Sequence, residues 1–176
     1  MPHDRESPSD WVSRFAPLIA PAGRVLDLAC GHGRHTRLLA GLGFSVTAVD
    51  RDEQALASIY EIAGEVMQAD LESGAWPFER QLFAGVIVSN YLHRPLLPRL
   101  VQALLPGGVL IYETFAVGNE RYGRPANPKF LLEPGELLRL AYGHLRIVAY
   151  EDLYSDRPRP AMVQRICAVN GGAASW

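Results

Sequence analysis

Residues 24–33 read Arg-Val-Leu-Asp-Leu-Ala-Cys-Gly-His-Gly, and this stretch decides the fold that we predict for the chain. Its first five residues are typical of a short buried strand, and the residues after Gly33 favour a helix. Glycines between a strand and a helix let the backbone approach a ligand closely. The stretch therefore predicts an α/β fold with a ligand site at the carboxyl end of this strand.

Strands and helices alternate on the carboxyl-terminal side of this stretch, with short connections between them. Such alternation predicts a parallel sheet with helices on both faces. The strands are expected over residues 44–49, 65–69, 83–89 and 109–115, and the helices over residues 34–40, 52–63 and 95–104.

The last third of the chain departs from this alternation. A helix is expected from Pro134 to Tyr142, followed by strands over 145–153 and 161–169 with only a short polar turn between them. Strands joined so closely must be antiparallel. We therefore predict a Rossmann-like, mostly parallel sheet of seven strands that ends in an antiparallel C-terminal hairpin.

The length of 176 residues fits one domain with one substantial core. Within it, residues 1–22 are expected to contain an N-terminal helix. Residues 116–130 are rich in glycine, proline and asparagine, so we expect a loop there that acts as a lid.

Composition excludes several classes of function. A net charge of −2 and a pI near 6.2 do not favour nucleic acid as a partner. No apolar run approaches the roughly 20 residues that span a bilayer. The two cysteines suggest no disulfide framework, and residues 1–6 do not resemble a secretion signal, so we expect a cytoplasmic protein.

Three aspartates stand at the expected strands and predict a nucleoside site. Asp50 ends the second strand, where a carboxylate accepts hydrogen bonds from the ribose hydroxyls of a nucleoside cofactor. Asp70 follows the third strand, and with Leu71 it can meet an adenine ring. Asp27 lies inside an apolar strand, where a carboxylate is costly unless donors surround it. Either the turn or a ligand's ammonium group would supply those donors.

These features resemble the class I S-adenosylmethionine (SAM)-dependent methyltransferases, whose first motif reads Asp-Leu-Gly-x-Gly-x-Gly. Residues 27–33 match this motif with Ala29 in place of its first glycine. The resemblance covers nearly the whole chain, which would form a single methyltransferase domain over residues 1–176. Residues 130–150, with Pro134-Gly135-Glu136-Leu137, are similar to the small tellurite-resistance-type methyltransferases.

The resemblance implies that SAM is the cofactor and S-adenosylhomocysteine (SAH) the product. Asp27, Gly31 and Gly33 would hold the methionine part of SAM, and Asn90 would line its sulfonium end. Arg51 would lie against the adenine face. The full set of expected cofactor-binding residues is Asp27, Ala29, Cys30, Gly31, Gly33, Asp50, Arg51, Asp70, Leu71 and Asn90. No metal site is expected, although Cys30, His32 and His35 stand close together in the sequence.

The expected acceptor is a small molecule, because the chain has no basic nucleic-acid-binding region. The catalytic candidates follow the fourth strand or end the fifth, and they are Tyr91, His93 and Glu113. Arginines 94, 99, 121 and 124, with Lys129, favour an anionic acceptor.

Several alternatives stay open from the sequence. The chain could be an RNA or protein methyltransferase, or a SAM- or SAH-binding regulatory protein without turnover. A nicotinamide-binding Rossmann domain is the nearest rival, but Thr36 stands where its third glycine is expected. A homodimer could complete one side of the pocket.

Overall fold

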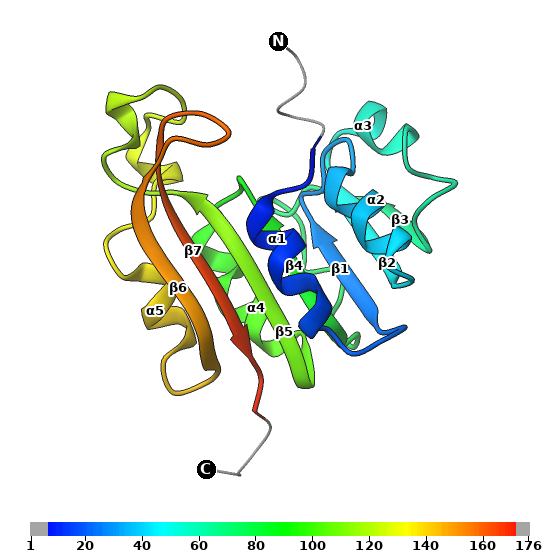
Figure 1. Cartoon of the computed structure of the whole chain (residues 1–176). Coiled ribbons are helices and arrows are strands. Elements are labelled where there is room, and N and C mark those ends of the chain that lie inside the picture. Colours follow the sequence, from blue (N-terminus) through cyan, green and yellow to red (C-terminus); the bar gives the residue numbers. More distant parts are fainter. Residues whose placement is uncertain (1–6, 172–176) are drawn as a thin grey trace.

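A seven-stranded sheet in the order β3-β2-β1-β4-β5-β7-β6 forms the centre of the structure (Figure 1). This is a computed structural model that describes residues 7–171, so the expectations for residues 1–6 lie outside it. The strands are β1 (Arg24–Leu28), β2 (Ser45–Asp50), β3 (Glu65–Gln68), β4 (Phe83–Ser89), β5 (Leu104–Phe115), β6 (Arg146–Ser155) and β7 (Ala161–Val169).

The direction of the strands confirms the predicted topology. Strands β1 to β5 pair in parallel, whereas β7 pairs antiparallel with both β5 and β6. The sheet is therefore mostly parallel with an antiparallel C-terminal hairpin. The predicted bounds of β4 and β7 agree with the structure at both ends.

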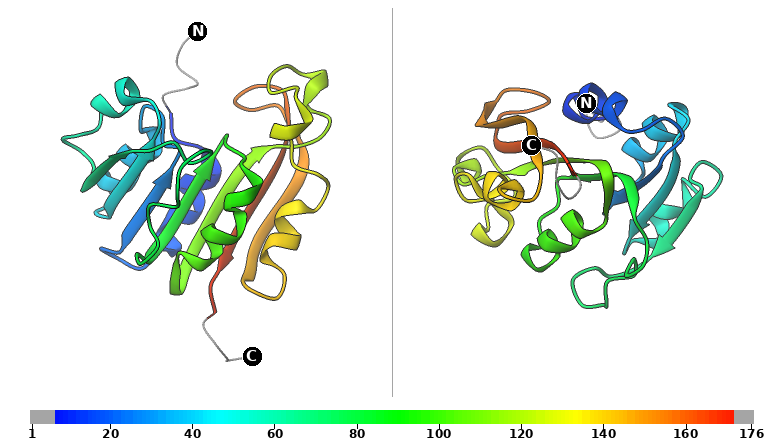
Figure 2. Two further views of the ribbon diagram at one scale, coloured as in Figure 1. Left: turned by 180° about the vertical axis from the view of Figure 1, so that it is seen from behind. Right: turned by 90° about the horizontal axis from the view of Figure 1, so that it is seen from below.

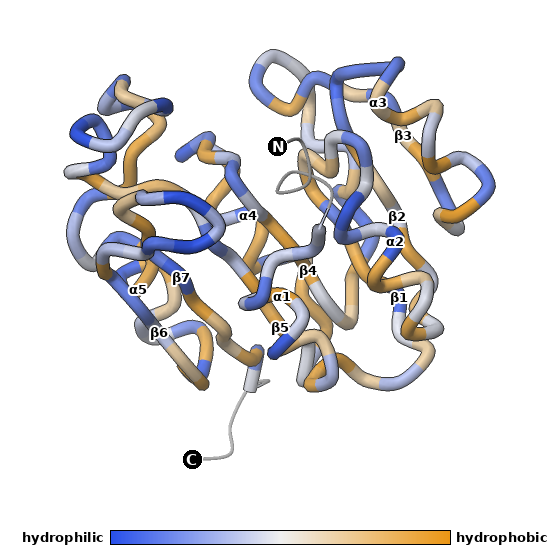
Figure 3. The backbone as a smooth tube through the Cα atoms, turned by 45° about the horizontal axis from the view of Figure 1, so that its top comes forward, coloured by the Kyte–Doolittle hydropathy of each residue, from blue (hydrophilic) through white to orange (hydrophobic). Residues whose placement is uncertain are grey.

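Helices cover both faces of the sheet, as Figure 2 shows. They are α1 (Asp10–Phe15), α2 (Arg34–Gly41), α3 (Glu53–Ala57), α4 (Leu97–Gln102) and α5 (Glu136–Ala141). Two core clusters separate the faces: Val25 and Ile87 pack with α1, and their neighbours Leu26 and Val86 pack with α4 and α5. Burial on both faces explains why β4 is an almost uninterrupted apolar run, coloured mainly orange in Figure 3.

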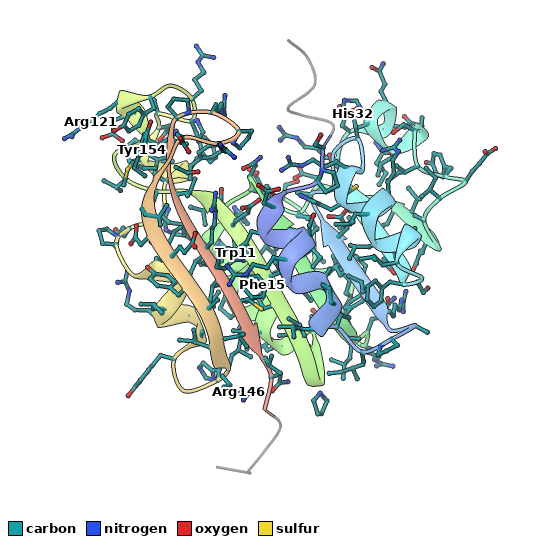
Figure 4. The ribbon with its side chains drawn as sticks, in the orientation of Figure 1. Trp11, Phe15, His32, Arg121, Arg146 and Tyr154 are labelled. Atoms are coloured by element: carbon teal, nitrogen blue, oxygen red, sulfur yellow. The ribbon has the colours of Figure 1, made fainter. Side chains whose placement is uncertain are left out.

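The first helix and the last strand are joined directly. The Ser9 hydroxyl caps α1 by accepting from the backbone N–H groups of Trp11 and Val12. Trp11 is buried, and its indole Nε1 donates to the carbonyl of Ile166 in β7 at 3.2 Å. Trp11 and Phe15 thus hold α1 against the sheet (Figure 4).

The helix expected over residues 52–63 was wrong in its extent, because α3 ends at Ala57. Asp52 caps its start as predicted, accepting from the N–H groups of Gln54 and Ala55. At Ser58 the backbone carbonyl accepts from Arg37 Nη2 at 2.9 Å, an interaction from outside the helix. A side chain thereby takes the acceptor that a longer helix would have used.

Two other helices are shorter than expected. The segment 95–104 begins with a 3-10 turn at Arg94–Leu96, and its α-helical part is Leu97–Gln102. The helix after Pro134 begins only at Glu136, because Gly135 takes a left-handed conformation with φ of 70°. Neither change affects the order of the sheet.

Candidate functional site

A cavity of about 490 Å³ opens at the carboxyl ends of the parallel strands. This is the position at which open α/β sheets bind ligands, and the volume is in the usual range for small-molecule sites. Its wall consists of Ala29, Asp50, Arg51, Ala69, Asp70, Leu71, Glu72, Asn90, Tyr91, Leu92, Thr114, Phe115, Pro125 and Phe130. Of the expected cofactor residues, Ala29, Asp50, Arg51, Asp70, Leu71 and Asn90 are in this wall.

In the turn of residues 29–33, called the glycine turn here, only Ala29 is in the cavity wall. Ala29 and Gly31 both have φ of 54°, and Gly33 has φ of 74°. A left-handed conformation costs a non-glycine residue about 1–2 kcal/mol, which gives a reason for glycine at this position in the first motif. Ala29 therefore carries local strain beside the cavity, and so does Asn90 with φ of 55°.

Cys30, Gly31 and Gly33, expected to bind the cofactor, do not line the cavity. The Cys30 N–H donates to Val49 at 3.0 Å and joins the turn to β2. Burial raises the pKa of its thiol, so the thiol stays protonated. Gly33 packs against Ile59, whereas an added Cβ at Gly31 would meet no atom within 4 Å. Gly31 thus borders open space, as a backbone that receives a ligand must.

Asp50 has the geometry expected of a ribose-binding carboxylate. Its Oδ2 accepts from the Gly31 N–H at 2.8 Å, and its Oδ1 accepts from the Asp52 N–H at 2.9 Å. An ionised carboxylate offers about four acceptor positions. Each oxygen of Asp50 therefore keeps a position for a further donor.

Asp70 is exposed, and the turn that follows β3 fixes its orientation. The Ser73 hydroxyl donates to Oδ2 at 2.6 Å and the Glu72 N–H donates to Oδ1 at 3.0 Å. These hydrogen bonds, the one from Ser73 first, hold the pKa of Asp70 below its usual value. Asp70 is therefore an ionised acceptor beside the buried side chain of Leu71.

Asp27 does not reach the cavity, and its carboxylate meets the turn. The Thr36 hydroxyl donates to its Oδ2 at 2.6 Å, and the side chain is 2% exposed. Burial raises the pKa of Asp27 to about 6, although the hydrogen bonds from Thr36 lower it. Asp27 was expected to meet donors either from the turn or from a ligand's ammonium group. The contact with Thr36 matches the first of these roles.

The raised pKa of Asp27 predicts a stability that falls with pH. The native protein binds the proton more tightly than the unfolded chain, so the free energy of unfolding decreases as pH rises from about 4 to about 6. The full decrease is about 3 kcal/mol. In urea unfolding at pH 7.5 we expect Asp27→Asn to have a free energy of unfolding higher than the wild type by most of this amount. Near pH 4 we expect the two free energies to be almost equal. An equal gain at both pH values would contradict the prediction, and exposed Asp156→Asn is the control.

Of the three catalytic candidates, only Tyr91 lines the cavity. Burial, followed by the charges of Glu72 and Asp70, raises its pKa to about 12, so the hydroxyl is a donor at neutral pH and not a base. This hydroxyl is buried and has no hydrogen-bond partner among residues 7–171. Tyr91 therefore shares its part of the cavity wall with Asp70 and Glu72.

His93 and Glu113 lie outside the cavity wall. His93 borders a second hollow of about 360 Å³, together with Trp76 and Arg99. Glu113 forms an ion pair with Arg165 at 3.3 Å and accepts from the Ser89 hydroxyl at 3.3 Å. The structure therefore does not bring the three candidates together, and the role of each stays a prediction.

The far wall of the cavity consists of Leu92, Phe115, Pro125 and Phe130, together with Thr114. The sequence interpretation did not name Leu92, Phe115, Pro125 or Phe130 as site residues, although Pro125 and Phe130 belong to the segment 116–130 expected to form a lid. Phe130 is an exposed aromatic residue, but so is Tyr122 in the same segment, so the sequence carried no signal that singles out Phe130.

His35, one of the three candidate metal ligands, takes part in a different contact. His35 is buried, its Nε2 accepts from the Ser9 N–H at 3.1 Å, and burial lowers its pKa to about 3. Within residues 7–171, no group of three histidine, cysteine, aspartate or glutamate side chains is placed to hold a metal ion. No helix in the same range is long and apolar enough to cross a membrane.

Comparison with known proteins agrees with this geometry. Residues 25–108 match a family described as a methyltransferase domain. The trans-aconitate 2-methyltransferase of Paracidovorax citrulli is 37% identical over 117 residues, which are 61% of this chain and 44% of that protein. The trans-aconitate 2-methyltransferase of Delftia acidovorans is 28% identical over 176 residues, or 92% of this chain and 65% of that protein. The chain thus spans less than two thirds of either relative.

The chain is thus similar to methyltransferases, and the family match covers residues 25–108 of its 176 residues. Its fold is similar to the crystal structure of TehB from Haemophilus influenzae, with a TM-score of 0.75 and 19% identity. That likeness covers 90% of this chain and 61% of TehB. It confirms the resemblance to the tellurite-resistance type at the level of the fold.

Proposed function

We propose that this chain transfers a methyl group from SAM to a carboxylate oxygen of a small acceptor. The far wall of the cavity is the observation that carries the proposal. Leu92, Thr114, Phe115, Pro125 and Phe130 include no titratable side chain. An amine or hydroxyl acceptor needs a base to remove its proton, whereas a carboxylate is already ionised at neutral pH.

The near wall is the rest of the cavity lining, and its residues fit SAM. They are Ala29, Asp50, Arg51, Ala69, Asp70, Leu71, Glu72, Asn90 and Tyr91. Asp50 would accept from the ribose hydroxyls with the acceptor positions left by Gly31 and Asp52. Asp70 would accept from the adenine amino group beside Leu71, and Arg51 and Tyr91 would border the ring. Open space at Gly31 would receive the methionine part near Ala29 and Asn90.

When bound, SAM supplies a methyl group activated by a sulfonium, so the acceptor oxygen takes the methyl carbon and the electron pair stays on sulfur. The chain's own contribution is to align the acceptor and to exclude water. Phe115 and Phe130 would provide apolar contact on the acceptor side. Residues 116–130 are proposed to close over the site as a lid, because Pro125 and Phe130 are already in the wall.

The relatives named trans-aconitate 2-methyltransferases support a carboxylate acceptor and supply the first probe. We expect purified protein with SAM and trans-aconitate to produce SAH and a methyl ester in equal amounts, measured by mass spectrometry. Boiled protein and reactions without acceptor are the controls.

Other outcomes would favour the remaining alternatives. Methylation of RNA or protein, with no ester from any carboxylate probe, would overturn the proposed acceptor class. Tight binding of SAM and SAH with no turnover on any probe would favour a regulatory protein. Failure of folded protein to bind either ligand would overturn the assignment of the cofactor.

A further inference from the structure

An arginine from the β6–β7 turn reaches the far wall of the cavity. The Arg159 Cζ lies 5.4 Å from the ring centre of Phe115, which lines the cavity. Its Nη2 donates at 3.1 Å to the carbonyl of Arg124, directly before the wall residue Pro125. Arg159 is not itself in the cavity wall, but it contacts the wall residue Phe115 and the residue directly before the wall residue Pro125.

The charge around this end is mainly positive and uncompensated. Residues 116–130 and 156–160 contain five basic and two acidic side chains. Within residues 7–171, none of these seven takes part in an ion pair. The Glu120 carboxylate accepts from the Gly118 N–H instead. By contrast, Arg94 and Arg165, on neighbouring elements, are each paired with a glutamate.

The two ends of the cavity thus differ in charge. In the near wall the three carboxylates of Asp50, Asp70 and Glu72 outnumber the one cation, Arg51, whereas Arg124 and Arg159 lie beside the far wall. A ligand that is cationic or neutral at one end and anionic at the other complements this arrangement. For a carboxylate acceptor, the far end offers a guanidinium as a second binding point.

We infer that Arg159 is a specificity-determining residue that binds a second carboxylate of the acceptor, remote from the one that is methylated. This inference rests on the proposed function. The ring of Phe115 and the carbonyl of Arg124 hold one side of the guanidinium. Its Nη2 has a second N–H, which can form a fork for the two oxygens of a carboxylate with either Nε or Nη1. Neither Nε nor Nη1 donates to a group among residues 7–171.

The test compares an acceptor that has several carboxylates with one that has a single carboxylate. Steady-state methylation of trans-aconitate and of crotonate is measured for the wild type, Arg159→Gln and Arg159→Lys. We expect KM for trans-aconitate to rise about tenfold or more in Arg159→Gln, since a charge-assisted bidentate contact is lost. We expect kcat, the kcat/KM for crotonate and the affinity for SAH to change by less than about twofold.

Arg157→Gln is the matched control. This variant removes the same charge from the same turn, but the Arg157 side chain is exposed and only its backbone forms hydrogen bonds among residues 7–171. We expect the KM of this control for trans-aconitate to stay within about twofold of the wild type. The KM of Arg159→Lys should lie between those of the two glutamine variants, since lysine keeps the charge but lacks the forked donors of the guanidinium.

The outcomes separate the inference from the proposed function. If Arg159→Gln keeps the wild-type preference for trans-aconitate, the inference is wrong and the function stands. If Arg157→Gln raises KM as much as Arg159→Gln, general surface charge attracts the acceptor and the assignment to Arg159 is overturned. If the wild type binds SAH but methylates neither carboxylate, the proposed function itself fails.

Discussion

Replacement of Asp50 with alanine is expected to weaken the binding of SAM and SAH about tenfold or more, a loss of at least about 1.4 kcal/mol. The carboxylate would lose its contacts with the ribose hydroxyls. It would also release the Gly31 N–H, which it holds at 2.8 Å, so the glycine turn would loosen. Calorimetric titration of both ligands into the folded variant measures the change.

Asp52→Ala provides a control for the charge and for the helix. Asp52 is two residues from Asp50 and caps α3, but it is not in the cavity wall. We expect this variant to lose about 1 kcal/mol of stability while its affinity for SAM stays within about twofold. Equal affinities for Asp50→Ala and the wild type would remove Asp50 from the cofactor site.

The second large effect is expected from Gly33→Ala, and it concerns stability. An added Cβ would lie 2.3 Å from Cγ2 of Ile59, and Ile59 is fully buried. Because Cγ2 is attached close to the backbone, the segment after α3 would have to move. The clash and the left-handed conformation together should cost on the order of 2–4 kcal/mol. Urea unfolding followed by circular dichroism measures this loss.

Gly31→Ala tests the left-handed conformation without a clash. The new Cβ would meet no atom within 4 Å, so only the left-handed conformation, with φ of 54°, opposes it. We expect a stability loss of about 1–2 kcal/mol together with weaker SAM binding, because the methyl group would occupy ligand space. A Gly33→Ala protein as stable as Gly31→Ala would contradict the packing argument.

The sequence was sufficient for the number and directions of the strands because strand and helix signals come from local patterns, but it did not place β7 between β5 and β6. The apolar run at 83–89 and the polar turn between the last two strands set the parallel sheet and its antiparallel end. The end of α3 was not predictable in this way. At that end Arg37, which is remote from Ser58 in sequence, donates to the Ser58 carbonyl, and no local pattern reveals this contact.

The site was predicted less completely, because the position of a residue at a strand end does not determine its direction. Glu113 was chosen for its place at the end of β5, yet it lies opposite Arg165 of β7 and pairs with it. That partner is known only once β7 is placed beside β5. His93 likewise follows β4, but the 3-10 turn after it carries the side chain toward the second hollow.

The strand β7 lies inside the sheet although it is the last strand of the chain, and this has a consequence for synthesis. A ribosome adds about 5–20 residues per second, so β5 emerges seconds before the strand that covers its outer edge. During that interval the edge of a strand containing the apolar residues Leu110 and Ile111 has no neighbour. Trp11 also lacks its acceptor at Ile166 until then. The nascent protein should therefore be most vulnerable to aggregation after β5 has emerged and before β7 has been synthesised.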